Sequence, residues 1–199
     1  EMLAGGVTCF NDMYFYPQAS AEAVLQAGMR AQLGLVVLEF PTNYANNADD
    51  YIEKGLLIRD AWRGNPFLSA SLAPHAPYTV SDITFEKVIT YAEQLGLGIH
   101  THLHETKAEV AESIENFGVR PIKRMANLGL LGPNLTAAHC VQINDEDLDL
   151  LSEHRAHVAH CPSSNAKLAS GIAPVNHLLN KGINVGLGTD GAASNNRQD

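Results

Sequence analysis

Three histidines at alternate positions, followed at once by a glutamate, are the most conspicuous chemistry-bearing residues of the sequence. His100, His102 and His104 lie in GIHTHLHET, residues 98–106, together with Glu105. In a strand, alternate side chains point to the same face. Imidazole nitrogens and carboxylate oxygens together suit one divalent transition metal ion, chiefly zinc, with iron, manganese or nickel as alternatives. A catalytic zinc ion keeps one position for water and lowers the pKa of that water to about 7.

Metal-assisted hydrolysis also needs a nearby acid or base that moves protons. Glu105, three residues after His102, is placed for that role, whereas we expect His100 to pack in a core layer and His104 to lie outside the reacting centre. Other polar residues end other apolar segments of the chain. They are Asp12, His75, His139, His160 and Asp190.

The elements that must position these residues alternate along the chain. Short apolar segments predict strands at 6–13, 31–40, 67–75, 97–105, 135–141, 157–162 and 183–190. Amphipathic segments predict helices at 20–32, 47–63, 81–96, 107–118, 120–129, 144–154 and 173–182, with N-caps such as Ser20, Ser81 and Asn144.

Such alternation is typical of a parallel α/β sheet with helical crossovers. No glycine-rich phosphate loop follows the first strand, which argues against an open dinucleotide-binding sheet. We therefore predict a (β/α)8 TIM barrel with seven of its eight strands present and the first one missing. In a barrel the C-terminal ends of all strands share one rim, so polar residues far apart in sequence would meet there.

Bulk properties exclude several function classes. The 199-residue chain has a formal net charge of −9, which argues against nucleic acid or an anionic membrane as partner, and no apolar run is long enough to span a bilayer. Cys9, Cys140 and Cys161 are odd in number and lack CxxC spacing, as is typical of reduced, cytoplasmic proteins. The sequence predicts a single soluble catalytic domain over residues 1–199, and a homo-oligomer is left open.

Five motifs carry a resemblance to a known family. They are SLAPHAPYT, HTHLHET, AAHCV, HCPSSNAKLASGIAPV and GTDGAASNN. In this order and spacing they resemble the amidohydrolase superfamily. More narrowly, they resemble the 5-methylthioadenosine/S-adenosylhomocysteine deaminases, in the group that also holds triazine hydrolases.

The resemblance implies a role for each matching residue. His102 would ligate the metal ion, and Glu105 would touch the substrate ring and shuttle protons. His139 would orient the water, and Asp190 would both ligate the metal and accept a proton from the water. His75 in APHAPYT and Arg30 in GMRA match positions that bind the substrate, as do Glu105 and Asp190.

Two departures from the family pattern affect what we expect. The family takes two more metal ligands from an HxH pair on its first strand, and no usable pair exists here, so we expect an internal fragment whose missing ligands precede Glu1. Some members carry a second arginine that binds the amino-acid carboxylate of S-adenosylhomocysteine. The corresponding segment, residues 38–51, contains no arginine, which favours 5-methylthioadenosine.

The expected activity is metal-dependent hydrolysis of a 6-aminopurine nucleoside to an inosine-type product and ammonia. One alternative is another aminohydrolase of the superfamily, acting on guanine, a triazine or a pterin. A second alternative is an inactive, truncated barrel fragment that lacks two metal ligands.

Overall fold

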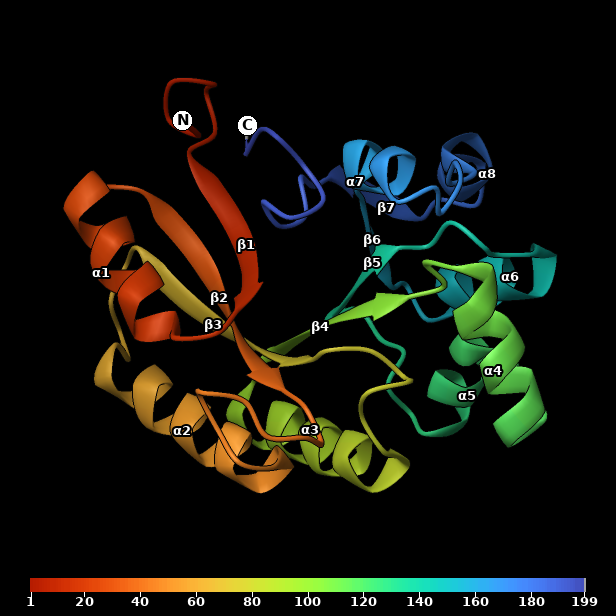
Figure 1. Ribbon diagram of the computed structural model, residues 1–199, viewed down its shortest axis with the longest axis horizontal. Helices are drawn as coiled ribbons and strands as arrows, with labels where there is room; N and C mark the ends of the chain where they lie inside the picture. The colour runs from red at the N-terminus through yellow and green to blue at the C-terminus, as the bar shows by residue number, and fades with distance from the viewer. Residues whose placement is uncertain (199) are drawn as a thin grey trace. The chain divides into compact units, whose positions relative to one another are not determined.

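The computed structural model of the protein describes residues 1–198 and contains seven strands in sequence order (Figure 1). The strands are β1 (Cys9–Tyr14), β2 (Arg30–Val37), β3 (Leu68–Pro74), β4 (Gly98–Leu103), β5 (Leu135–His139), β6 (His157–His160) and β7 (Asn184–Leu187). The pairs β1–β2, β2–β3, β3–β4, β5–β6 and β6–β7 are parallel. All seven predicted strands are thus confirmed, as is the α/β class.

The described chain forms two compact units, each with its own strands. The first comprises residues 1–75 and 79–100. It holds β1, β2, β3 and the start of β4, with the helices α1 (Pro17–Ala27), α2 (Ala48–Ala61) and α3 (Asp82–Leu95). In this unit α1 and α2 pack against β2 and α3 packs against β3, as expected for crossover helices of a parallel sheet.

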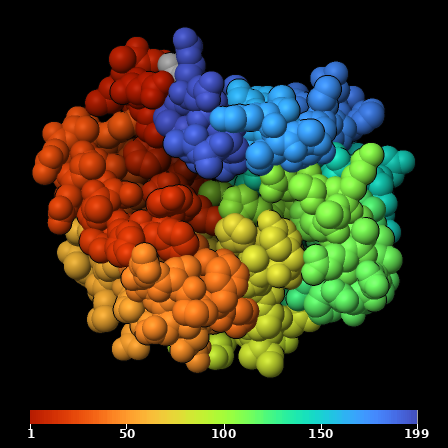
Figure 2. Space-filling view, viewed as in Figure 1, coloured from red at the N-terminus to blue at the C-terminus, as the bar shows by residue number. Residues whose placement is uncertain are grey.

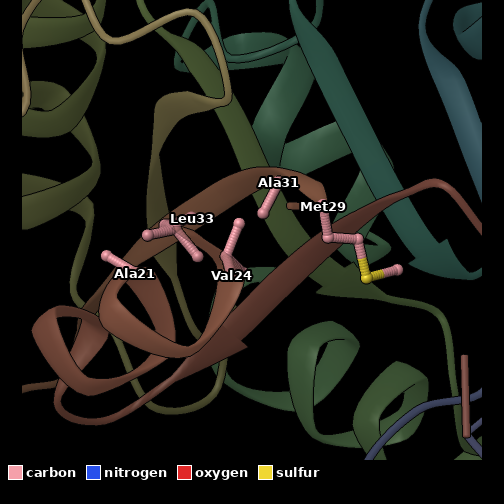
Figure 3. Close-up of a cluster of buried hydrophobic side chains, with 5 residues drawn as sticks. All are labelled: Ala21, Val24, Met29, Ala31 and Leu33. Atoms are coloured by element: carbon pink, nitrogen blue, oxygen red, sulfur yellow. The ribbon is translucent and has the colours of Figure 1, made fainter. Parts of the chain in front are cut away.

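Apolar packing joins α1 to β2 in the first unit. Ala21 and Val24 of the helix meet Ala31 and Leu33 of the strand, with Met29 at the turn between them (Figure 3). All five residues are buried, so this cluster fixes the helix to the sheet through the hydrophobic effect.

A glycine allows β1 and β2 to lie close together. An added Cβ at Gly34 would stand 2.3 Å from the backbone oxygen of Asp12, which is closer than any side chain tolerates. Glycine at this position of β2 is therefore required by the neighbouring backbone.

The first helix differs from its prediction at both ends. The sequence suggested residues 20–32 with Ser20 as N-cap, but α1 begins at Pro17 and ends at Ala27, with Gly28 in the left-handed conformation after it. Proline suits the first helical position because its fixed φ is already helical. Glycine ends the helix because it adopts a positive φ without strain. Residues 30–32 consequently belong to β2.

The second unit comprises residues 76–78 and 101–198 and carries the end of β4 with β5, β6 and β7. Its helices are α4 (Lys107–Phe117), α5 (Pro121–Asn127), α6 (Asp145–Glu153), α7 (Pro162–Lys167) and α8 (Val175–Asn180). In this unit α4 and α6 pack on α5, and α8 packs on β7. The outer face of α4 lies at the surface, in green in Figure 2.

Helix caps follow the predictions in part. Ser81 and Asn144 are the N-caps of α3 and α6, as predicted, and the Asn144 cap is completed by Asp147 in a reciprocal capping box. The short helix α7 was not predicted, because Pro162 and the small polar residues after it lack helical periodicity. Among the described residues, no helix combines the length and apolar character needed to cross a membrane.

Candidate metal centre and active site

Three potential metal ligands converge in the second unit. His102 lies in β4, His139 is the last residue of β5, and Asp190 follows β7 by three residues. One ligand atom from each lies within 4.8 Å of the others, and the two imidazole rings stack with centroids 5.3 Å apart. This set fits a divalent ion, because zinc binds nitrogen and oxygen ligands at about 2.0–2.2 Å and so draws them into such a cluster.

The carboxylate of Asp190 is held by three hydrogen bonds. Ser164 Oγ and Ser194 Oγ donate to Asp190 Oδ2 at 2.5 and 2.7 Å, and the Gly191 amide donates to Oδ1 at 2.8 Å. Burial alone would raise the pKa of Asp190, but these hydrogen bonds outweigh it and lower the pKa below its ordinary value. Asp190 is therefore a fixed anion, which is the form that ligates a metal ion.

His139 is buried and its ring is oriented by an amide. Its Nδ1 donates to Asn165 Oδ1 at 2.8 Å, so that Nε2 carries the lone pair. Nε2 lies 3.7 Å from Glu105 Oε2, too far for a hydrogen bond. Asn165, from α7, thus selects the tautomer that can accept a proton or bind a metal ion at Nε2.

Glu105 follows β4 and reaches the same cluster. Its side chain is mostly buried, and Oε1 accepts a 3.4 Å hydrogen bond from Ser170 Oγ. The other carboxylate oxygen, Oε2, faces His139. The carboxylate therefore lies beside the three potential metal ligands but is not one of them. It is therefore placed to exchange protons with a molecule bound there.

Strained backbone accompanies this cluster. Among the described residues, seven non-glycine residues have positive φ, and four of them lie at the ends of β4, β5 and β7. Such conformations cost about 1–3 kcal/mol each and persist where the surroundings enforce them, commonly at functional sites. The four are His104, His139, Cys140 and Asp190.

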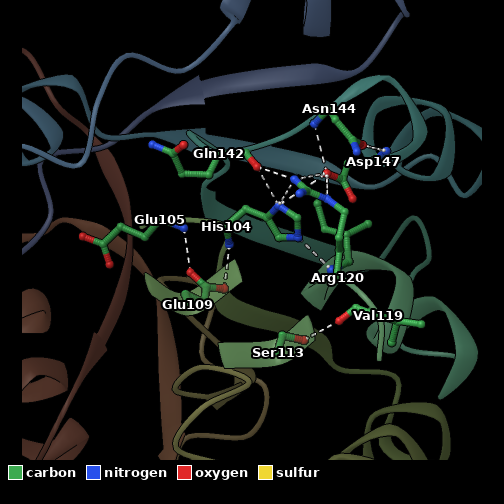
Figure 4. A network of polar contacts seen from close by, with 10 residues as sticks. His104, Glu105, Glu109, Ser113, Val119, Arg120, Gln142, Asn144 and Asp147 are labelled. Atoms are coloured by element: carbon green, nitrogen blue, oxygen red, sulfur yellow. Dashed lines mark hydrogen bonds and ion pairs between the residues drawn. The ribbon is translucent and has the colours of Figure 1, made fainter. Parts of the chain in front are cut away.

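His104 is completely buried beside Asp147 (Figure 4). It is not one of the three potential metal ligands. Its Nδ1 donates to the carbonyl of Gln142 at 3.1 Å, and its Nε2 accepts from the amide of Ile122 at 2.9 Å. Burial lowers the pKa of His104 to about 4, although Asp147 opposes the shift. The imidazole is therefore neutral near pH 7.

Replacing His104 with Asn should cost more stability at pH 7.5 than at pH 4.5. Between pH 6.5 and 4 the unfolded histidine binds a proton that the folded one does not, so the wild type loses stability as the pH falls. The loss is at most about 3 kcal/mol. Urea titrations of both proteins at the two pH values measure the difference. Equal destabilisation at both would contradict a neutral, buried His104.

The substrate-binding residues predicted from the resemblance, His75 and Arg30, both lie in the first unit, but far apart. His75 follows β3, and its Nδ1 lies 2.9 Å from Thr79 Oγ1. Arg30 is the exposed first residue of β2. Val37, at the other end of β2, pairs with Pro74, the residue before His75. Seven residues of strand span about 23 Å, so the structure places His75 and Arg30 near opposite ends of β2 and does not bring them together.

Of two other polar residues expected at strand ends, Asp12 differs from the expectation and His160 agrees with it. Asp12 lies within β1 and accepts a 3.3 Å hydrogen bond from Ser20 Oγ of α1, so its side chain faces a helix. Burial raises its pKa. His160 ends β6 as predicted, and burial, followed by the charge of His139, lowers its pKa.

Reasoning from the sequence missed the residues that hold the reactive groups. Asn165, Ser164 and Ser194 all lie within the quoted motifs, but small polar side chains there are equally typical of capped turns. Only their hydrogen bonds to His139 and Asp190 distinguish them. Spacing alone could not have predicted these contacts, which join residues 26 positions apart in two cases.

Comparisons with known proteins identify the family. The profile described as "Amidohydrolase family" matches residues 1–199. A 5-methylthioadenosine/S-adenosylhomocysteine deaminase from Saccharophagus degradans is 53% identical over 98% of this chain and 44% of its own length. The deaminase of the same name from Teredinibacter turnerae is 51% identical over 100% of the chain and 45% of its own length. The chain thus spans less than half the length of these relatives.

Solved structures agree with this match. A zinc-bound adenosine deaminase from Xanthomonas campestris is 44% identical, with a TM-score of 0.97, over 100% of this chain and 45% of that one. An atrazine chlorohydrolase from Arthrobacter aurescens, 22% identical, shares the fold with a TM-score of 0.91 over 98% of this chain and 48% of that one. These matches confirm the predicted fold class, the α/β fold of the amidohydrolase barrels. The chain belongs to the amidohydrolase family.

Proposed function

We propose that the protein is a hydrolytic deaminase of 6-aminopurine nucleosides, with 5-methylthioadenosine as its preferred substrate. The observation that carries the proposal is the convergence of His102, Glu105, His139 and Asp190 within one unit. Relatives at 53% and 51% identity that bear the deaminase name support the substrate class.

His102 and Asp190 would hold one divalent ion, most simply zinc, as in the bound structure from Xanthomonas campestris. When bound, the ion supplies Lewis acidity and lowers the pKa of a water molecule to about 7. His139 lies close enough to be a further ligand, but Nε2, the ring nitrogen that does not bind Asn165, also suits the role expected from the resemblance, which is to orient the attacking water.

The proton transfers would be divided between two carboxyl groups. Asp190, an anion held by Ser164 and Ser194, would take a proton from the attacking water. Glu105 would take the other proton of the water and donate it to N1 of the purine while the water oxygen adds at C6. The proton held by Asp190 would then pass through Glu105 to the C6 amino group, which leaves as ammonia. The buried donors around both carboxyl groups are fixed before reaction, which is generally a large catalytic contribution.

Substrate preference follows from a missing charge. Residues 38–51 contain no arginine to pair with the amino-acid carboxylate of S-adenosylhomocysteine. The small, uncharged 5′ group of 5-methylthioadenosine needs no such partner. A cytoplasmic location is also part of the proposal, because Cys9, Cys140 and Cys161 are all unpaired thiols.

The test uses the product of the complete open reading frame that contains this chain, loaded with zinc. Ammonia release is measured with 5-methylthioadenosine, S-adenosylhomocysteine, adenosine, guanine and a triazine as substrates. We expect kcat/KM to be at least about tenfold higher for 5-methylthioadenosine than for S-adenosylhomocysteine, corresponding to about 1.4 kcal/mol for one absent ion pair.

Each other outcome has a definite meaning. Comparable kcat/KM values for 5-methylthioadenosine and S-adenosylhomocysteine would contradict the proposed preference but would still support the deaminase activity. Turnover of only guanine or only the triazine would show that the substrate class is not the 6-aminopurine nucleosides. No turnover of any of the five compounds by protein that binds zinc would refute the proposed activity.

A further inference from the structure

We propose that Glu109 and His104 clamp the peptide between His104 and Glu105, which makes Glu109 a positioning residue for the proton carrier Glu105 (Figure 4). The inference rests on the proposed function, because it takes Glu105 as the group that moves protons. No part of the family resemblance assigns a role to either His104 or Glu109.

The hydrogen bonds of Glu109 carry the proposal. Glu109 lies in the first turn of α4, and its two carboxylate oxygens accept from two successive amides. Oε1 accepts from the amide of His104 at 2.8 Å, and Oε2 accepts from the amide of Glu105 at 2.7 Å. These amides belong to successive peptide planes on either side of the His104 Cα, so a carboxylate that accepts both fixes the orientation of each plane.

This arrangement goes beyond ordinary helix capping. In a capping box the third helical residue returns to the amide of the N-cap, as Asp147 does to Asn144 in α6. The corresponding residue of α4 is Glu109, and the N-cap of this helix is Thr106. Glu109 instead accepts hydrogen bonds from the amides of the two residues that precede the N-cap. Thr106 meanwhile caps the helix with its own hydroxyl, which accepts from the amide of Glu109 at 3.1 Å.

The burial of Glu109 makes this contact costly. Only 5% of the residue is exposed, and burial raises its pKa to about 7, against the opposing effect of the amide hydrogen bonds. A buried carboxyl group costs free energy that a small neutral residue would not. Since the helix already has a cap, the benefit must lie in the segment that Glu109 holds, residues 104–105.

His104 completes the clamp, because all four of its polar atoms are hydrogen-bonded. Its amide donates to Glu109, and its carbonyl accepts from the amides of Val141 and Gln142 at 3.0 and 2.8 Å. Its ring nitrogens bind the carbonyl of Gln142 and the amide of Ile122. The left-handed φ of 54° at His104 is thus enforced by partners from three other segments of the same unit.

The clamp determines where the Glu105 carboxylate lies. Beyond the backbone, the Glu105 side chain meets Ser170 Oγ at 3.4 Å and His139 Nε2 at 3.7 Å, both long distances. The side chain therefore depends mainly on its peptide for position. Displacement of a catalytic group by about 1 Å can cost 10²-fold in rate.

The test is Glu109→Gln in the complete zinc-loaded protein. Glutamine keeps the size of the side chain but can accept only one of the two amides, and its own N–H groups face the other. We expect kcat to fall about 10- to 100-fold. KM should change less than about threefold and zinc content should not change, because Glu109 contacts neither the metal ligands nor the substrate.

Asp50→Asn is the matched control. Asp50 is the third residue of α2 and likewise accepts, at 2.9 Å, the amide of a residue before the N-cap, Asn46. It lies in the first unit and carries no group of the proposed site. We expect the kcat of this variant to stay within twofold of the wild type.

Combination with Glu105→Gln separates positioning from general damage. If Glu109 acts through Glu105, then adding Glu109→Gln to Glu105→Gln lowers the residual rate less than twofold. Loss of the same factor in both backgrounds would overturn the proposal. So would a kcat of Glu109→Gln within threefold of the wild type.

Hydrogen exchange distinguishes failure of the clamp from failure of the proposed function. In Glu109→Gln the amides of His104 and Glu105 should exchange at least tenfold faster, and in Asp50→Asn they should not. If the wild type deaminates no substrate, the proposed function fails and the clamp is decided by exchange alone. Unchanged exchange would overturn the clamp whatever the activity.

Discussion

Replacing Glu105 with Gln is expected to lower kcat for deamination by about 10³-fold, within the 10²- to 10⁴-fold range of general acid–base catalysis. Glutamine has nearly the same shape but cannot carry a proton to N1 of the purine or to the leaving amino group. Its amide can still contact Ser170, so the fold and the cluster of metal donors should persist. The measurement is the steady-state rate of ammonia release with 5-methylthioadenosine, together with zinc content.

Glu115→Gln is the control for this substitution, because Glu115 is an exposed acid on α4, away from the cluster. Its kcat should equal that of the wild type. If the Glu105→Gln variant retained more than about a tenth of the wild-type kcat, Glu105 would not be the group that transfers the protons. Loss of zinc in parallel with activity would instead assign Glu105 to metal binding.

Replacing Asp190 with Asn is expected to lower zinc affinity by at least about 10²-fold, more than the 10- to 100-fold typical of residues that only support a ligand. The neutral amide loses the charge that binds the ion, whereas Ser164 and Ser194 can rotate their hydroxyls and keep the loop in place. Zinc content after dialysis against a weak chelator, measured by mass spectrometry, reports the affinity. Deamination should fall in proportion to bound zinc or further.

Asp149→Asn controls for the loss of one negative charge, since Asp149 is an exposed acid that pairs with Lys181. His139→Gln in the same experiment separates the two roles that His139 could have. Retained zinc with lost turnover supports the orientation of water, and lost zinc makes His139 a ligand. Wild-type zinc content in Asp190→Asn would disprove the proposed metal centre.

Sequence patterns predicted the elements better than the contacts between them. The seven strands were recognisable because buried parallel strands are largely apolar runs, such as residues 33–38. The start of α1 was misjudged because Ser20 is a good cap, whereas Pro17 determines the first turn. Arg30 was misplaced for the same reason, since the residues assigned to the end of a helix belong to β2.

The reactive residues could be predicted because their chemistry is rare, but their supports could not. Histidine and acidic residues after successive strands indicate a shared edge in any parallel barrel. Asn165, Ser164 and Glu109 are ordinary helix-start residues in sequence. Their roles arise from hydrogen bonds to backbone and side chains that only tertiary folding brings near.

The distance along the chain between the metal donors has a consequence for the life of the protein in the cell. His102 and Asp190 are 88 residues apart in sequence and become neighbours only in the folded second unit. An ion that binds both therefore binds the native state and not the unfolded chain, so each tenfold rise in free metal above the dissociation constant adds about 1.4 kcal/mol to stability. Metal scarcity would then reduce the amount of surviving protein as well as its turnover, and abundance of the enzyme would follow the zinc supply.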